Sequence, residues 1–374
     1  MANTRQHQMH EQKLEELVKT MPFYIVEYVD QKIGSRSPST LLNYVYDYKL
    51  FLEWLIAEGI TNAAQIKDVP MSVLENLKLV EAQAFIKYLE RRNIPINKKE
   101  MKKAEKVSIN RKISALRSLF KYLTTQTENE DGELYFYRNV MLKIEVTKVK
   151  ETLNARASRI ASKIFQDDDD TRFLEFLKHD YEEGLPADSR KRIYFKRDKE
   201  RDIGIISLFL GSGIRVNELS SLRLCDLDFK RSQISVLRKG GKADIVAVVP
   251  ESMIDLKNYL SIRAERYNGT SEDYDYVFLT KVKNEACPLS NRSIEALVKK
   301  YTKAYKSNKS MSPHILRHTF GTNLMAETGD IHLLMTQLGH STTSTAALYT
   351  NPEQEKARHA AEQLGKRRIA QIKD

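Results

Sequence analysis

The sequence has little cysteine and no long apolar run, and these absences exclude several classes of protein. Two cysteines, Cys225 and Cys287, occur in 374 residues, too few for a disulfide framework or a cysteine-rich zinc site. No run of 18 apolar residues is present, so we expect no transmembrane helix. The first residues also lack the apolar segment of a signal peptide. We therefore expect a reduced, soluble, cytoplasmic protein.

The composition is that of a globular chain with an excess of positive charge. Hydrophobic residues make up 41% of the sequence, and 14 glycines and 9 prolines are too few for a disordered or fibrous chain. The length of 374 residues predicts two or three domains. The formal net charge of +11 favours a polyanionic partner, nucleic acid before a membrane surface.

Much of the positive charge is concentrated in residues 98–117. This stretch holds only two acidic residues, Glu100 and Glu105. Its eight basic residues are Lys98, Lys99, Lys102, Lys103, Lys106, Arg111, Lys112 and Arg117. One interpretation is a solvated loop that leads into a helix. The other is a face that contacts DNA phosphates, which would supply affinity without sequence information.

Residues 1–145 are predicted to form a small helical bundle with one basic side. Apolar residues recur at helical spacing after the loop GSRSPST and again after Ser108, which we expect to be a helix N-cap. A shorter helix, LVEAQAFIKYLERR, lies between these two segments. The apolar positions are Leu41, Val45, Tyr48, Leu52 and Leu55 in the first segment and Ile109, Ile113, Leu116, Phe120 and Leu123 in the second.

Charge runs of both signs fill residues 124–200, and such runs are typical of solvated faces. We place a domain boundary near residue 150 and interpret residues 151–200 as a linker or insertion. From residue 201 onward the pattern changes. QISVLR and ADIVAVV read as two short strands joined by KGGK, because a glycine pair supplies the positive φ angles of a tight hairpin. Helices are predicted on both sides of this hairpin, one of them with Ser312 as N-cap and Pro313 as first residue.

Four short stretches in this second half carry unusual polar residues: GSGIRVNEL, LRKGGKADI, PHILRH and LGHSTTSTAALYTN. Two arginines can grip the non-bridging oxygens of a phosphodiester, histidine and lysine can transfer protons, and a tyrosine phenol can act as a nucleophile. Each residue alone is more often part of the surface or core, but together they predict phosphoryl transfer without a metal or another cofactor. The candidates are Arg215, Lys239, His314, Arg317, His340 and Tyr349.

The order and spacing of these motifs over residues 211–351 resemble the tyrosine site-specific recombinases, the phage-integrase and Xer family. Stretches such as FLEWL, SALRSLFKYLT and RKGGK are most similar to the single-recombinase Xer type. The resemblance covers nearly the whole chain. It implies a mainly α, two-domain fold, with an N-terminal helical core-binding bundle over residues 1–150. A C-terminal α+β catalytic domain with a small antiparallel sheet would cover residues 201–374.

The resemblance also implies how the candidate residues act. Tyr349 would attack a scissile DNA phosphate, form a 3′-phosphotyrosyl link and release a 5′-hydroxyl. Arg215 and Arg317 would clamp that phosphate and stabilise the charge that develops on it.

The remaining candidates would move protons or hold the phosphate. Lys239, with Lys242 as runner-up, would be the general acid for the leaving 5′-oxygen. His314 would take or return the tyrosine proton, and His340 would donate a hydrogen bond to the phosphate. Lys242 is also a candidate DNA contact. His318 follows Arg317 directly and lies one turn beyond His314, so it reads as a residue that supports the catalytic side chains from behind or as a packing residue. A zinc site at His314 and His318 is not expected, because the glutamate and the third ligand of a zinc helix are missing.

The partners implied are double-stranded DNA and three further copies of the chain, giving a homotetramer on two DNA sites. The stretch EQEKARHAAEQLGKRRIAQI, which begins at Glu353, is expected to be a helix exchanged between protomers, with packing in cis as the alternative. The Xer type further implies resolution of chromosome dimers at a dif-like site during division, possible control by a division-linked DNA translocase, and no need for ATP. The alternatives are the integrase of a mobile element, a type IB-like topoisomerase and a non-catalytic DNA-binding regulator.

Overall fold

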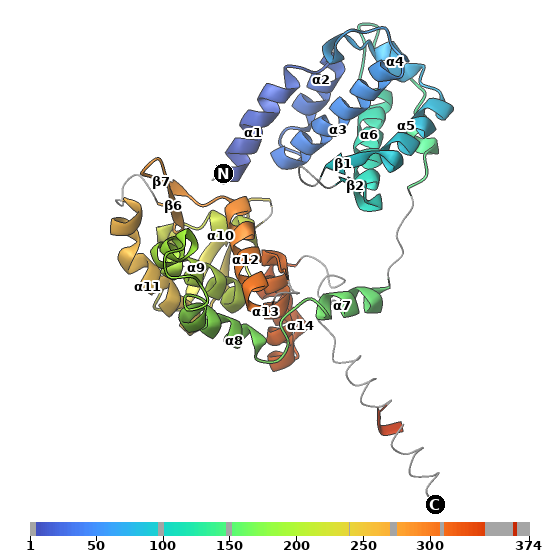
Figure 1. The fold of residues 1–374 in the computed structure, drawn as a ribbon. Helices are drawn as coiled ribbons and strands as arrows, with labels where there is room; N and C mark the ends of the chain where they lie inside the picture. The colour runs from blue at the N-terminus through green and yellow to red at the C-terminus, as the bar shows by residue number, and fades with distance from the viewer. Residues whose placement is uncertain are drawn as a thin grey trace, which may run out of the picture. The chain divides into compact units, whose positions relative to one another are not determined.

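A computed structural model describes residues 5–95, 101–146, 152–238, 240–269, 275–306, 310–340 and 362–364. The chain divides into two compact units, Met1–Lys150 and Glu151–Asp374, each with its own hydrophobic core (Figure 1). Within the described residues, no helix combines the length and the apolar character that crossing a membrane would require.

The first unit is a helical bundle with one small hairpin. Its elements are α1 (Arg5–Val18), α2 (Phe23–Lys32), α3 (Pro38–Ala57), η1 (Ile66–Asp68), α4 (Met71–Glu75), α5 (Leu79–Arg91), β1 (Asn93–Pro95), β2 (Met101–Lys103), α6 (Lys106–Thr125) and η2 (Val140–Lys143). The ten apolar positions predicted to face the core of this bundle are all buried on α3 and α6. Tyr48 on α3 also donates a hydrogen bond to the carbonyl oxygen of Ala115 on α6, 3.0 Å away.

Two details around the basic stretch differ from the prediction. Helix α6 begins at Lys106, with Glu105 as N-cap. Ser108 is therefore not the cap, because its backbone N–H already donates to the carbonyl of Glu105 within the first turn. The chain before this helix is not an open loop either, since β1 and β2 pair as antiparallel strands from Asn93 opposite Lys103 to Pro95 opposite Met101.

The second unit is α+β. Its elements are α7 (Leu153–Ala161), α8 (Asp169–Glu175), the π-helical turn η3 (Phe176–Asp180), α9 (Arg190–Ser212), α10 (Val216–Ser220), η4 (Leu224–Asp226), β3 (Leu227–Asp228), β4 (Gln233–Leu237), β5 (Ala243–Ala247), α11 (Pro250–Tyr267), β6 (Leu279–Val282), β7 (Glu285–Pro288), α12 (Asn291–Tyr305), α13 (Pro313–Thr328) and α14 (Ile331–Leu338). The apolar half of α9 is buried where it packs against α11 and α13, in the middle of the unit (Figure 1).

The interpretation of residues 151–200 as a linker or insertion is wrong. Phe165, Phe173, Leu177 and Phe195 lie in the same buried core as the apolar half of α9. Charge runs dominate this stretch, and its apolar residues occur only in short groups between them, such as Phe165 beside Ile164 and Phe173 beside Leu174. The stretch belongs to the second unit.

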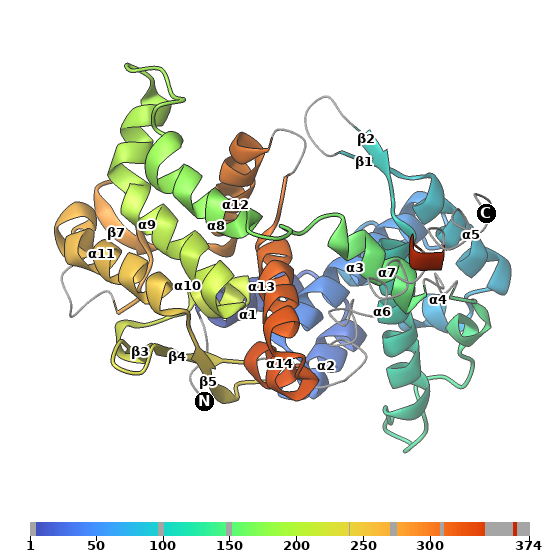
Figure 2. The same cartoon turned by 90° about the horizontal axis from the view of Figure 1, so that it is seen from below.

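The predicted hairpin is confirmed and is part of a three-stranded antiparallel sheet in the order β3–β4–β5. Gly240 and Gly241 have φ angles of 89° and 75°, which a residue with a Cβ adopts only with strain. A second hairpin, formed by β6 and β7, was not anticipated from the sequence. Figure 2 shows α14 beside β5, and two hydrogen bonds between the side chain of Gln337 and the backbone of Ala247 join them.

Gly213 and Gly329 allow a matched test of packing at two helix ends. Both are left-handed C-caps, with φ angles of 66° and 64°. A Cβ on Gly213 would lie 2.4 Å from Cδ1 of Phe320, whereas a Cβ on Gly329 would meet nothing within 4 Å. We expect Gly329→Ala to cost about 1 kcal/mol of unfolding free energy from backbone strain alone, and Gly213→Ala about 3 kcal/mol or more. Equal losses in denaturant titrations would show that the Gly213 site relaxes freely.

Candidate active site

Arg215 lies at the N-cap of α10, directly after the turn that ends α9 at Gly213. Its Nη1 donates to Oε1 of Glu218 at 2.8 Å, and its Nη2 donates to the carbonyl oxygen of Gly339 at 3.3 Å. About a third of the side chain remains exposed, 38%. The guanidinium is thus held from two sides and still accessible to a ligand.

Glu218 is a buried carboxylate shared by two arginines. Besides the pair with Arg215 Nη1, its Oε2 accepts the backbone N–H of Arg215 at 2.8 Å and Nη1 of Arg238 at 3.1 Å. The side chain is only 3% exposed. The sequence analysis missed Glu218 and Arg238. The signals were available, because Glu218 follows Arg215 at the capping distance of three residues and Arg238 directly precedes Lys239.

Arg317 is almost fully buried on α13, with 1% of the residue exposed. Its Nη1 donates to the carbonyl oxygen of Gly213 at 2.7 Å, its Nη2 donates to that of Leu338, and Nη2 lies 3.1 Å from Nε2 of His340. A buried guanidinium is stable only with such partners, because it stays charged at any physiological pH. The predicted arginine pair thus meets through α14, although Arg215 and Arg317 are far apart in the sequence.

Three consecutive carbonyl oxygens at the C-terminal end of α14 receive the three guanidinium groups. We call residues 337–339 the carbonyl turn. Gln337 accepts from Arg238 at 2.7 Å, Leu338 from Arg317, and Gly339 from Arg215. Helix C-termini carry unsatisfied carbonyls and a partial negative charge, so they attract cations. The carbonyl turn therefore gathers positive charge beside His340.

His340 follows this turn, and its ring lies against the Arg317 guanidinium. Burial, together with the nearby charges of Arg317, Arg215 and Arg238, lowers the pKa of His340 to about 4. The imidazole is therefore neutral at neutral pH in the DNA-free protein. In that form one ring nitrogen can accept a hydrogen bond and the other can donate one.

His314 and His318 form a pair on one face of α13. Their Nε2 atoms lie 3.1 Å apart, so one ring must donate and the other accept. Burial and the charge of Arg317 both lower the pKa of each ring, and the pKa of His318 falls to about 3. The tautomers of the two rings are therefore coupled, because only one of the two Nε2 atoms can carry the shared proton. Across the described ranges, no three histidine, cysteine, aspartate or glutamate side chains gather as metal ligands would.

Several predicted residues lie outside the described residues, namely Lys98, Lys99, Lys239, Tyr349 and the segment that follows Tyr349 up to residue 361. The remaining basic candidates divide into two groups. In the first group, Lys102, Lys103 and Lys106 are exposed at the β1–β2 hairpin and the start of α6, and Lys242 is exposed at the β4–β5 hairpin. Lys102 also pairs with the exposed Glu105.

The second group consists of Arg111, Lys112 and Arg117. The side chains of these three residues are engaged in contacts within the first unit. The buried Asp47 pairs with both Arg111 and Lys112, with 3.1 Å between its Oδ1 and Nζ of Lys112. Arg117 donates to the carbonyl oxygens of two residues near η2, Met141 and Ile144. Arg117 is therefore a structural cross-link within the bundle, and the expectation that it contacts DNA finds no support in its geometry.

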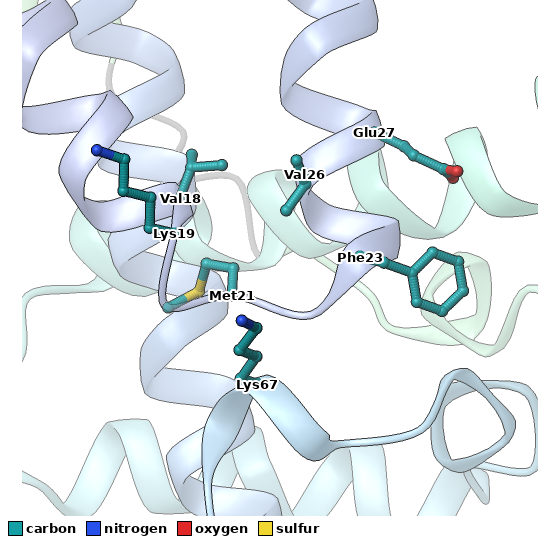
Figure 3. A pocket seen from close by; sticks show the side chains of 7 residues that line it. All are labelled: Val18, Lys19, Met21, Phe23, Val26, Glu27 and Lys67. Atoms are coloured by element: carbon teal, nitrogen blue, oxygen red, sulfur yellow. The ribbon is translucent and has the colours of Figure 1, made fainter.

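A separate hollow of about 500 Å³ lies in the first unit between the end of α1, the start of α2 and η1 (Figure 3). Its lining is mainly apolar, with Lys19, Glu27 and Lys67 among the polar residues at its edge. None of the candidate catalytic residues lines it.

Comparison with known proteins identifies the family. The phage integrase family matches residues 175–356, and the phage integrase N-terminal SAM-like domain matches residues 27–127. Tyrosine recombinase XerS of Lactococcus lactis subsp. cremoris is 40% identical over 354 residues, which cover 94% of this chain and 98% of that relative. Tyrosine recombinase XerS of Streptococcus mutans is 39% identical with the same coverage.

Solved structures share the fold. A post-cleavage complex of the XerH site-specific recombinase with a palindromic difH substrate has a TM-score of 0.59 at 19% identity, covering 87% of this chain and 78% of that one. The chain belongs to the phage integrase family and is a tyrosine recombinase of the XerS type. It is thus an enzyme, a DNA strand transferase, and the predicted fold class and family are confirmed.

The lowered pKa of His340 predicts a pH dependence of stability. Between pH 4 and 6.5 the unfolded chain binds a proton at this histidine that the folded chain does not, so the free energy of unfolding falls as the pH falls through this range. Replacing His340 with Asn removes that difference. We expect the slope of unfolding free energy against pH between 5 and 6 to decrease by the equivalent of roughly one proton. An unchanged slope would show that His340 is charged in the folded protein.

Proposed function

We propose that this recombinase cuts and rejoins DNA at a phosphate held by Arg215 and Arg317, and that the second unit is its catalytic domain. The observation that supports this most is the meeting of both guanidinium groups with His340 at the carbonyl turn. Two arginines with a neutral imidazole beside them form a ready site for one phosphodiester anion. The arginines would neutralise the charge that develops on the non-bridging oxygens during attack.

In the proposed mechanism, Tyr349 supplies the nucleophile. Its phenolic oxygen forms a bond to phosphorus while the bond from phosphorus to the 5′-oxygen breaks. The DNA is left with a 3′-phosphotyrosyl link and a free 5′-hydroxyl. The 5′-hydroxyl of a partner strand then attacks the same phosphorus and releases the tyrosine. One phosphodiester is exchanged for another, so the reaction needs no ATP.

The proton transfers are assigned to three further residues. Lys239 is proposed to protonate the leaving 5′-oxygen, with Lys242 as the alternative. His314 is proposed to take the phenolic proton and later return it, and its hydrogen-bonded contact with His318 supports this role, because it helps to hold the His314 ring in place. His340 is proposed to donate a hydrogen bond to the phosphate.

Replacing Tyr349 with Phe tests the nucleophile. We expect the variant to bind target DNA normally and to form no covalent DNA adduct on a nicked suicide substrate, because only the hydroxyl oxygen is removed. The exposed Tyr194 offers the matched control, and Tyr194→Phe should leave adduct formation unchanged. Adducts formed by the Tyr349→Phe protein at the wild-type level would contradict the assignment.

We also propose that the first unit is a core-binding domain that contacts DNA phosphates through Lys102, Lys103 and Lys106, with Lys98 and Lys99 nearby in the sequence. The exposure of the three described lysines supports this. Arg111 and Lys112 are weaker candidates, because the buried Asp47 offsets their charge.

The salt dependence of DNA binding tests this surface. Replacing Lys102 and Lys103 together with Ala should weaken binding to all sequences alike. It should also reduce the slope of log affinity against log salt by about 2, one for each phosphate that the variant no longer neutralises. Lys67→Ala, at an exposed lysine beside the apolar hollow of the first unit, is the control and should leave the slope unchanged. An unaltered slope in the double variant would remove the β1–β2 hairpin from the DNA interface.

For the biological role, we propose resolution of chromosome dimers at a dif-like site during division, in the cytoplasm, by a homotetramer on two DNA sites. The whole-length likeness to XerS proteins supports the role more than it supports a mobile-element integrase. The C-terminal segment is proposed to exchange between protomers, and control by a division-linked DNA translocase belongs to the same proposal. A topoisomerase would religate the nicked strand only, so strand-exchange products on suicide substrates distinguish the two activities.

A further inference from the structure

Arg238 uses all three of its side-chain nitrogens, each on a different element of the second unit. Nε donates to Oδ2 of Asp244 on β5 at 2.9 Å, Nη1 to Oε2 of Glu218 on α10 at 3.1 Å, and Nη2 to the carbonyl oxygen of Gln337 on α14 at 2.7 Å. The side chain is 9% exposed. A planar guanidinium can span three acceptors in this way, whereas a lysine has one nitrogen to offer.

Arg238 and Arg215 hold the two sides of the same buried carboxylate. Arg215 contacts Glu218 through its backbone N–H and Nη1, and Arg238 contacts it through Nη1. If Arg215 were the sole cation on Glu218, that carboxylate would offset its charge completely. Because Arg238 shares Glu218, part of the positive charge of Arg215 stays available for an anion from outside the protein.

Arg238 also fixes the carbonyl turn that orients Arg215. A Cβ on Gly339 would lie 2.6 Å from Nε and 2.9 Å from Cζ of Arg238, so the guanidinium packs directly against this residue. The carbonyl oxygen of Gly339 in turn accepts from Nη2 of Arg215. Arg215 is therefore linked to Arg238 along two routes, one through Glu218 and one through Gly339.

We propose that Arg238 is a positioning residue for the recombination reaction, which holds the Arg215 guanidinium in place and keeps its charge available for the scissile phosphate. In this proposal Arg238 itself does not contact the phosphate, because only 9% of its side chain is exposed and each of its three side-chain nitrogens already donates within the protein. The proposal rests on the proposed role of Arg215 as a phosphate clamp.

The test compares two DNA substrates in single-turnover cleavage. One carries the native scissile phosphodiester. In the other, a methylphosphonate replaces it, so a neutral methyl group stands where a charged non-bridging oxygen was. If an arginine neutralises this charge, its replacement should slow cleavage of the second substrate less than cleavage of the first. We expect Arg215→Ala to slow native cleavage about 10³-fold and methylphosphonate cleavage about tenfold or less. Arg238→Met should slow native cleavage about 10- to 100-fold, and its deficit should shrink in the same way.

A double variant tests whether Arg238 acts through Arg215. In the Arg215→Ala background, Arg238→Met should change the native rate by less than about threefold, because its partner is already absent. The control is Arg231→Met, at an arginine with a 76% exposed side chain that pairs with the neighbouring Asp228, and it should cleave both substrates normally. Melting curves and DNA affinity establish that each variant folds, and Arg238→Lys, with an intermediate deficit expected, carries the same test if Arg238→Met unfolds.

The outcomes separate this inference from the proposed function. An Arg238→Met deficit of equal size on both substrates, a deficit that multiplies with that of Arg215→Ala, or no deficit at all would each overturn the positioning role. The cleavage deficit of Arg215→Ala could instead be equally large on both substrates while the double variant stays non-additive. That result would contradict the charge-neutralising role of Arg215 and leave its coupling to Arg238 in place.

Discussion

The candidate active site depends on the attraction between three guanidinium groups and the C-terminal carbonyls of one short helix. Helix α14 ends at Leu338, and the carbonyl oxygens of residues 337–339 have no further turn of helix to bond. Arg238, Arg317 and Arg215 satisfy one carbonyl each. Three cations this close would repel one another, and the partial negative charge of the helix end together with the buried Glu218 offsets that repulsion.

This arrangement explains why a glycine ends the helix. Gly339 has a φ angle of 60°, and a side chain there would collide with Arg238. The same residue turns the chain so that His340 lies against Arg317 rather than continuing α14. Gly339 therefore satisfies two requirements, the positive φ angle of the turn and the close approach of the Arg238 guanidinium. With a neutral imidazole at His340, the arginines carry the positive charge at this end of α14. The carboxylates of Glu218 and Asp244 pair with Arg215 and Arg238.

Much of the fold could be predicted from the sequence, because its long helices have clear apolar periodicity. The faces of α3 and α6 were found from spacing alone, and the β4–β5 hairpin from its glycine pair. The stretch between residues 151 and 200 was not interpreted correctly, because Phe165, Phe173 and Phe195 belong to short apolar groups between charge runs, and their burial depends on tertiary contacts. The β1–β2 and β6–β7 hairpins are too short to give a periodic signal.

The candidate site divides in the same way. Arg215, His314, Arg317 and His340 could be chosen by motif and resemblance, and the structure brings Arg215, Arg317 and His340 together, with His314 paired to His318. Glu218 and Arg238 were not chosen, although each lies close to a motif residue in the sequence, because a charged residue near a motif is usually solvated. The structure shows their importance, because Glu218 is buried and accepts hydrogen bonds from both Arg215 and Arg238. Arg117 shows the converse, since a basic residue in a basic stretch turned out to bind backbone carbonyls.

The most direct test of the central claim is the structure of the chain bound to nicked target DNA and vanadate, which mimics the pentacovalent phosphorus of the transition state. The account predicts vanadium bonded to the Tyr349 oxygen, with the Arg215 and Arg317 guanidinium groups in hydrogen-bond contact with its equatorial oxygens and still seated on the carbonyl turn. Vanadate bonded to another side chain, or bound with both arginines turned away from it, would contradict the account.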